Sequence, residues 1–305
     1  MPAKDTKDAA PRWHPSLKKV FKDCDLWWQN NMVKRNKLEE ELGVLSVEVE
    51  TPGLFIPSAG TMQMVSHAYA TGACTSEAVD NPAYLADMLR RAVEFRALDL
   101  RTLAGMSLPL ANQPLRPFKS GMLAAGPAML SQWQLAEVCA QVLIDVAEKD
   151  LQVHPLKVSP DRWRRGTSDA FLIYLFADAF NLSTTYEPKD SVLPEYQAVL
   201  DAWRTDDEGL FRSIMQAASD FHISRSRGST NRMDYEFEYN FDRVYPAELL
   251  AVQALRRRIG APEFAVGHML VDTPWTLIRD LPEVAPHALA VQAEARLRKD
   301  YPSFR

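Results

Sequence analysis

Apolar residues recur every three or four positions along most of this chain, which is the spacing of amphipathic α-helices. The first such segment begins at Ser16 and ends at Gly43, a residue that often closes a helix. Further helices are expected wherever the same spacing returns, over residues 82–105, 131–149, 166–182, 193–207, 208–223, 245–260 and 287–301. The pattern predicts a mostly α fold, arranged as a multi-helix array or bundle.

The period changes from helical spacing to strict alternation in two places. Val47 and Val49 alternate with Glu48 and Glu50 before the turn signal Thr51-Pro52-Gly53, which predicts a short strand or hairpin. The second place is DYEFEYNFD, residues 234–242. In an extended segment its four rings would point one way and its acids and Asn240 the other. We therefore expect one or two short β-strands beside the helices.

Two interpretations of residues 234–242 remain open. An edge strand would use its rings to complete the core, and its acids would discourage pairing with other strands. Alternatively, the row of carboxylates forms a negative face for a basic partner, and Tyr239 at its margin acts as an anchor. The two interpretations are compatible, because the rings and the acids would lie on opposite faces.

The chain is expected to form one helical domain over residues 16–305. Residues 1–15 read as a flexible polar tail, because they begin MPAKDTKDAAPR and lack the apolar run of a secretory signal. No fixed sequence repeat is visible. A Pro-bearing connector near His154 is the best candidate for a sub-domain boundary.

The composition is typical of a globular protein with a sizeable core, with 47% hydrophobic and 25% charged residues in 305. The most apolar run, AFLIYLFA, is much shorter than the roughly 20 residues of a membrane span. The three cysteines, Cys24, Cys74 and Cys139, are far apart and have apolar neighbours, which favours reduced thiols. These features predict a cytoplasmic protein without a membrane partner.

Negative charge is concentrated in one part of the chain. The formal net charge is −5, and residues 183–250 alone carry thirteen acids against seven bases, about −6. Such a surface repels nucleic acid and attracts a basic protein. Its acids outside the alternating stretch include Asp206, Asp207 and Glu208.

The common catalytic signatures are not found. The sequence contains no Gly-rich phosphate loop, GxSxG elbow, HExxH, CxxC or EF-hand loop, and its six histidines have no strong metal-ligand spacing. We expect no metal and no cofactor. The best catalytic candidate is Asp220-Phe221-His222, in which His222 with nearby carboxylates would act as a general base or metal site. The structural alternative is that His222 ends a helix and bonds a carbonyl.

The loop after His222, SRSRGSTNRM, is predicted to be exposed. Its Arg225 and Arg227 have two interpretations. They would either hold a carboxylate or phosphate of a ligand, or neutralise the acids that follow in the sequence.

Several segments of the C-terminal half resemble a known class of proteins: GTSDAFLIYLFADAF, DAWRTDD, DFHI, YEFEYNFDRVYPAELLAVQALRRRIG and DLPEVAPHALAVQAEARLRKDYP. They resemble helical immunity proteins of bacterial polymorphic-toxin and type VI secretion loci. The resemblance is one of general pattern and carries no functional residue. It implies a cytoplasmic protein that binds one cognate toxin, occludes its active site and has no catalysis of its own.

The first hypothesis is therefore a non-catalytic immunity protein that neutralises a secreted, possibly basic toxin through an acidic face. The residues expected on that face are Asp206, Asp207, Glu208, Asp234, Glu236, Glu238, Tyr239 and Asp242. The second is a helical enzyme that uses Asp220, His222, Arg225 and Arg227. The third is a helical scaffold or assembly protein. An exposed apolar face on the Trp27-Trp28 helix would favour this hypothesis. The oligomeric state stays open.

Overall fold

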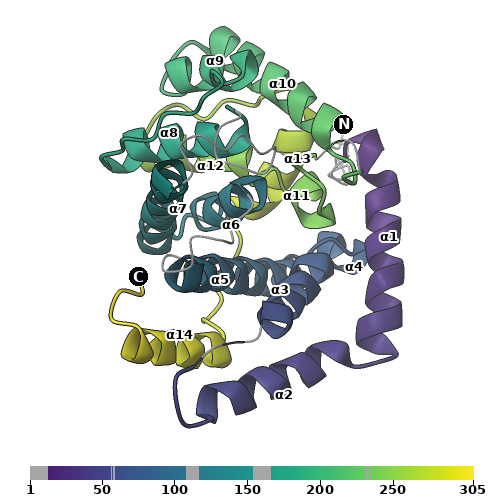
Figure 1. The fold of residues 1–305 in the computed structure, drawn as a ribbon. Helices are drawn as coiled ribbons and strands as arrows, with labels where there is room; N and C mark the ends of the chain where they lie inside the picture. Colours follow the sequence, from purple (N-terminus) through teal and green to yellow (C-terminus); the bar gives the residue numbers. More distant parts are fainter. Residues whose placement is uncertain are drawn as a thin grey trace, which may run out of the picture.

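The fold of the chain is almost entirely helical (Figure 1). The structure is a computed structural model and describes residues 13–55, 57, 59–107, 117–153, 166–230, 233 and 235–305. These residues form α1 (Lys18–Trp28), α2 (Lys37–Glu50), α3 (Ala59–Gly72), α4 (Ser76–Asp80), α5 (Pro82–Ser107), α6 (Pro117–Met129), α7 (Trp133–Val153), α8 (Ser168–Phe180), α9 (Pro194–Ala202), α10 (Glu208–Arg225), α11 (Asn240–Val244), α12 (Ala247–Arg258), α13 (Met269–Ile278) and α14 (Ala288–Asp300).

Helices α5 and α6 lie in the middle of the molecule (Figure 1). α5 packs against α3, and α6 packs against α5, α7, α8 and α12. α9 and α10 lie at one end and pack together, whereas α2 and α14 lie at the other end. The contacts of α6 with α8 and α12 join the two halves of the sequence. The expected sub-domain boundary at His154 lies outside the described residues.

The expected helix over residues 16–43 is two helices with a break. α1 continues into a π-helical turn (Gln29–Val33), and Asn36 then adopts a left-handed conformation, with φ of 51°, before α2 begins. Gly43 lies inside α2 and does not end it. Asn is among the few residues that tolerate this left-handed conformation, so a single residue can redirect the chain.

The strand expected at Val47 and Val49 is the last turn of α2 instead. Leu45 and Val49, four residues apart, are buried, while Val47 is 67% exposed. Burial therefore follows the helical period and not the alternation of the sequence. The prediction was wrong because a run of four alternating residues fits either structure.

The second expected strand is also not found among the described residues of 234–242. Residues 235–239 form a turn, and Asn240 begins the short helix α11. Phe237 and Phe241 are buried, as the alternation predicts, but so are Glu236 and Asp242. The only extended pairing in this part of the described chain is an isolated bridge between Thr230 and Met233.

The remaining helix predictions over residues 82–105, 131–149, 166–182, 193–223, 245–260 and 287–301 are confirmed by α5, α7, α8, α9 with α10, α12 and α14. The three cysteines are buried free thiols, as expected. Helices α3, α4, α6, α11 and α13 have no counterpart in the helix predictions. α6 is apolar on nearly every side and contains Pro127, which hides a helix from a search for amphipathic spacing.

Candidate functional site

Four exposed carboxylates of the acidic segment lie on α9, on α10 and in the loop between them. We call Asp201, Asp206, Asp207 and Glu208 the acidic end; all four are exposed. Asp207 caps α10, because its Oδ1 accepts the N–H of Leu210 at 3.0 Å. Glu208 lies 3.5 Å from Arg212, one turn further along the helix. Three of the residues predicted to contact a partner, Asp206, Asp207 and Glu208, are therefore accessible.

A buried arginine fixes the loop that carries the acidic end. Arg256 is fully buried and stacks on Phe211, 4.2 Å from the ring centroid. Its Nη1 donates to the carbonyl oxygens of Trp203 and Thr205 at 2.6 and 2.9 Å, and its Nη2 donates to Pro262 at 2.8 Å. The loop before Asp206 is thus tied to α12. The sequence places Arg256 at the basic end of a helix, and nothing in the sequence reveals that its side chain turns inward.

Two other residues of the predicted face lie in the core. The Glu236 side chain is 1% exposed and accepts a hydrogen bond from Arg225 Nε. Asp242 is 1% exposed and pairs with Arg96 Nη2 at 2.5 Å. Burial raises the pKa of the Asp242 carboxyl, and Arg96 opposes that rise. These two carboxylates are paired inside the core and are not open to a partner in this structure.

The rest of the aromatic stretch is partly accessible. Glu238 and Tyr239 are half-buried, and Asp234 lies outside the described residues. The Lys119 ammonium lies 5.9 Å from the centre of the Tyr239 ring. Tyr239 also lines a cavity of about 350 Å³ with His67, Arg96 and Lys119.

Arg225 and Arg227 both pack over Tyr235, at 4.7 and 4.9 Å from its ring centre. Arg225 neutralises Glu236, which agrees with the second interpretation of this loop. Arg227 is exposed, and its Nη2 donates to the carbonyl oxygen of Ser224 at 2.9 Å.

The candidate catalytic pair Asp220 and His222 is not brought together. The Asp220 side chain is 78% exposed and lies 3.4 Å from His268. His222 is fully buried, stacks on Phe237 with 3.7 Å between ring centres, and its Nδ1 lies 2.6 Å from Oε1 of Glu248. The structural alternative expected His222 to bond a carbonyl oxygen, and its partner is the Glu248 carboxylate instead. The role of His222 in the core is structural, as that alternative expected.

Sequence reasoning missed Glu248 as the partner of His222. The available signal was a single acid among apolar residues in YPAELLAVQAL, where every neighbour is expected in the core. Glu248 is fully buried at the first turn of α12. A carboxylate buried this deeply needs a partner, and His222 supplies one.

Further polar groups surround this pair and form a cluster between α8, α10 and α12. Burial raises the pKa of Asp169 to about 6, and the charge of Glu236 adds to that rise, while bonds from Thr167 and two backbone N–H groups oppose it. Burial, then the charges of Glu248, Glu236 and Asp169, raise the pKa of Tyr196. No protein hydrogen-bond partner is available among the described residues for several of the cluster's atoms: Ser168 Oγ, Asp169 Oδ2, Tyr186 OH and His222 Nε2.

The cluster contains side chains that can act in acid–base chemistry, but a substrate cannot reach them. His222, Glu248 and Tyr196 each have an exposed fraction of 0%. A general base must come within about 3 Å of a substrate proton, and these side chains are covered by protein. Among the described residues, no group of three His, Cys, Asp or Glu side chains is arranged to hold a metal ion.

The chain matches no known family model, no curated protein and no solved structure. Within the described part of the chain, every helix is too short or too polar to cross a membrane.

Proposed function

We propose that the chain is a non-catalytic, cytoplasmic immunity protein that binds and neutralises a cognate secreted toxin through its acidic end. The observation that carries this proposal is the exposure of Asp206, Asp207 and Glu208 on a loop that buried Arg256 holds in place. A preformed charged surface of this kind accelerates association with a basic partner and lowers the ordering cost of binding.

The accessible part of the aromatic stretch belongs to the proposal as a second contact region. Glu238 and Tyr239 remain half-exposed, and a Tyr ring is a favoured anchor in protein interfaces. The burial of Glu236 and Asp242 narrows the proposed face to the acidic end, Glu238 and Tyr239.

A binding role is favoured over the enzyme hypothesis by the surroundings of His222. Its ring lies between Phe237 and the Glu248 carboxylate, with no exposed surface. Such a pair specifies core packing, whereas catalysis requires a path to substrate.

A second candidate function, a scaffold or assembly protein, is favoured by the outer surface of α1 and α2. Trp27 and Trp28 themselves are half-buried. The large apolar side chains that are exposed on or next to these helices are Leu26, Val33, Val44, Val47 and Leu54. Exposed apolar residues gathered in one region are typical of interaction surfaces. Light scattering of wild type and of the Val33→Glu/Val47→Glu variant separates this candidate, because an assembly through this surface dissociates in the variant.

Co-expression tests the main proposal. The tagged protein is produced with the product of the gene beside its own, and the complex is purified at increasing salt. We expect a stoichiometric complex and growth protection from the neighbour's toxicity. If the neighbour is toxic and neither a complex nor protection is found, the proposal is wrong.

A further inference from the structure

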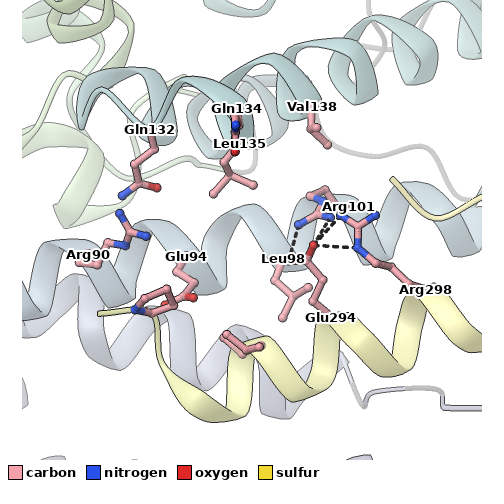
Figure 2. Close-up of a pocket in the computed structure, with 13 residues that line it drawn as sticks. Arg90, Glu94, Leu98, Arg101, Gln132, Gln134, Leu135, Val138, Glu294 and Arg298 are labelled. Carbon is pink, nitrogen blue, oxygen red and sulfur yellow. Dashed lines mark hydrogen bonds and ion pairs between the residues drawn. The ribbon is translucent and has the colours of Figure 1, made fainter. Parts of the chain in front are cut away.

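A cleft lies between α7 and α14 with α5 as its floor (Figure 2). Its cavity has a volume of about 310 Å³. A neighbouring cavity of about 940 Å³ extends it toward residues 278–286. Both cavities are lined by Arg90, Gln132, Leu135 and Pro286, so they form one continuous groove.

The charged groups at one end of the cleft satisfy one another. Glu294 accepts two hydrogen bonds from Arg101, each at 2.9 Å, and two from Arg298, at 3.0 and 2.7 Å. The hydrogen bonds and charge of Arg101, with those of Arg298, lower the pKa of Glu294 to about 2. This cluster is a fixed wall of the cleft (Figure 2).

Arg90 at the other end is differently placed. Its Nε is buried and has no hydrogen-bond partner among the described residues. Of the acids one turn away along the helix, Asp87 pairs with Arg91 at 2.7 Å, and Glu94 uses Oε2 to accept the N–H of His287 at 2.9 Å. A guanidinium that donates too few hydrogen bonds in a half-buried position is a ready site for a carboxylate.

Gln132 faces Arg90 across the cleft (Figure 2). Its Oε1 is also buried without a hydrogen-bond partner in the described part of the chain. The half-buried guanidinium of Arg90 is therefore the donor that the cleft offers. Between the two ends lie apolar side chains, Leu98, Leu135 and Val138, and Val291, which is 53% exposed.

We propose that this cleft binds an extended peptide segment of a partner protein that carries an acidic side chain. Its carboxylate accepts hydrogen bonds from the guanidinium of Arg90, and an adjacent apolar side chain packs against Leu135 and Val291. A peptide supplies both elements in one chain. The positive, half-buried Arg90 selects an acidic segment by charge complementarity.

This inference does not rest on the proposed immunity function. The acidic end attracts a basic surface, whereas the cleft takes an acidic segment. The acidic end lies on α9 and α10 and the cleft lies on α5, α7 and α14, so the two sites are tested separately.

The test uses the full chain, ¹⁵N-labelled, and two capped peptides, acetyl-Leu-Glu-Leu-Leu-amide and its Gln twin. The Arg90 Nε–H resonance is identified by its loss in Arg90→Met, and peptide is added up to millimolar concentration. We expect a saturable shift of this resonance and of the Val291 amide with the Glu peptide. The Gln peptide should bind about tenfold more weakly, which is the value of a charge-assisted hydrogen bond.

Variants confirm where the peptide binds. Arg90→Met should weaken binding of the Glu peptide about tenfold, followed at the Val291 amide. Val291→Glu places a carboxylate on the α14 side of the cleft and leaves Arg90 unchanged. It should weaken binding of the Glu peptide by a similar factor. The matched control is Arg212→Met, an exposed arginine on α10, which should bind as wild type does.

The proposal is overturned if neither peptide shifts these resonances, or if the Glu and Gln peptides bind equally. It is also overturned if inorganic phosphate shifts Arg90 as strongly as the Glu peptide does, because the site would then hold any anion. If Arg90→Met fails to fold by circular dichroism, Val291→Glu and the peptide pair still decide the outcome.

Discussion

At the scale of single residues, the most informative feature is that this acidic segment buries some of its carboxylates. Glu236, Asp242 and Glu248 each meet a cationic or ionisable partner: Arg225, Arg96 and His222. Such pairs contribute little net stability, but removing one partner leaves an unpaired charge in the core. The pairs therefore define which packing the helices can adopt.

The His222–Glu248 pair gives the first prediction. His222→Ala leaves the buried Glu248 carboxylate without its partner and should lower the free energy of unfolding by about 3–5 kcal/mol. The double variant His222→Phe/Glu248→Leu should lose much less than the sum of its single variants. Urea denaturation measures both. Asp220→Asn, on the exposed neighbouring acid, is the control and should change stability by less than about 0.5 kcal/mol.

Asp169 gives a prediction about pH. Burial raises its pKa from 3.8 to about 6, so between these values the folded state binds more protons than the unfolded state. The free energy of unfolding therefore falls as pH rises from 4 to 6, by up to ~3 kcal/mol from this group. Asp99, whose pKa is also raised by burial to about 6, adds a similar slope.

Asp169→Asn should remove its share of that slope while keeping an oxygen to accept the Thr167 hydroxyl. We expect the variant to match wild type near pH 4 and to be more stable at pH 7. Urea denaturation from pH 4 to 7 measures this. A variant less stable than wild type at pH 7 would show that the bonds to the ionised carboxylate outweigh its burial.

At the scale of elements, the sequence predicted helices well where one face is apolar and the other polar. α10 and α14 follow this pattern, and burial follows their 3.6-residue period. α6 was not predicted, because both its faces are buried. The last turn of α2 was predicted as a strand, because four alternating residues fit either a helix or a strand. Short patterns lack the length to separate the two periods.

The candidate site was harder to predict than the helices. The exposed acidic end could be read from sequence, since Asp206 to Glu208 lie in a polar turn between two amphipathic segments. The burial of Asp242 could not, because its partner Arg96 lies 146 residues away in sequence. The rings at Phe237 and Phe241 are buried as predicted, but a turn and a helix place them there.

The loop between α8 and α9 depends on Gly166, which gives an element-scale prediction. Gly166 has φ of 66°, and a side chain there would overlap the carbonyl oxygens of Asp190 and Ser191. Gly260, with φ of 71°, has open space around it. Gly260→Ala should cost about 1 kcal/mol for its backbone conformation alone. Gly166→Ala should cost about 2 kcal/mol more, because it adds overlap with the backbone. Equal losses in thermal or urea unfolding would contradict this packing.

At the scale of the whole molecule, the charge distribution separates two surfaces. The acidic end lies where α9 meets α10 at one end of the molecule (Figure 1), and the cleft with Arg90 lies between α7 and α14, on the central helix α5. A binding protein with this layout presents its carboxylates without folding on contact, which predicts fast, salt-dependent association.

Charge reversal at the acidic end tests the central claim most directly. The measurement is the association rate and affinity of the neighbour-encoded toxin for wild type, Asp206→Lys/Glu208→Lys and the control Glu50→Lys/Glu137→Lys, from 50 to 500 mM salt. Asp207 is left in place because it caps α10. The control changes the same number of exposed acids on α2 and α7.

The account predicts at least about a tenfold loss of association rate at low salt for the Asp206/Glu208 variant, with a flatter salt dependence, and a much smaller change for the control. If a folded Asp206/Glu208 variant binds the toxin with unchanged rate, affinity and salt dependence, the acidic end is not the binding surface and the proposed mode of inhibition is wrong.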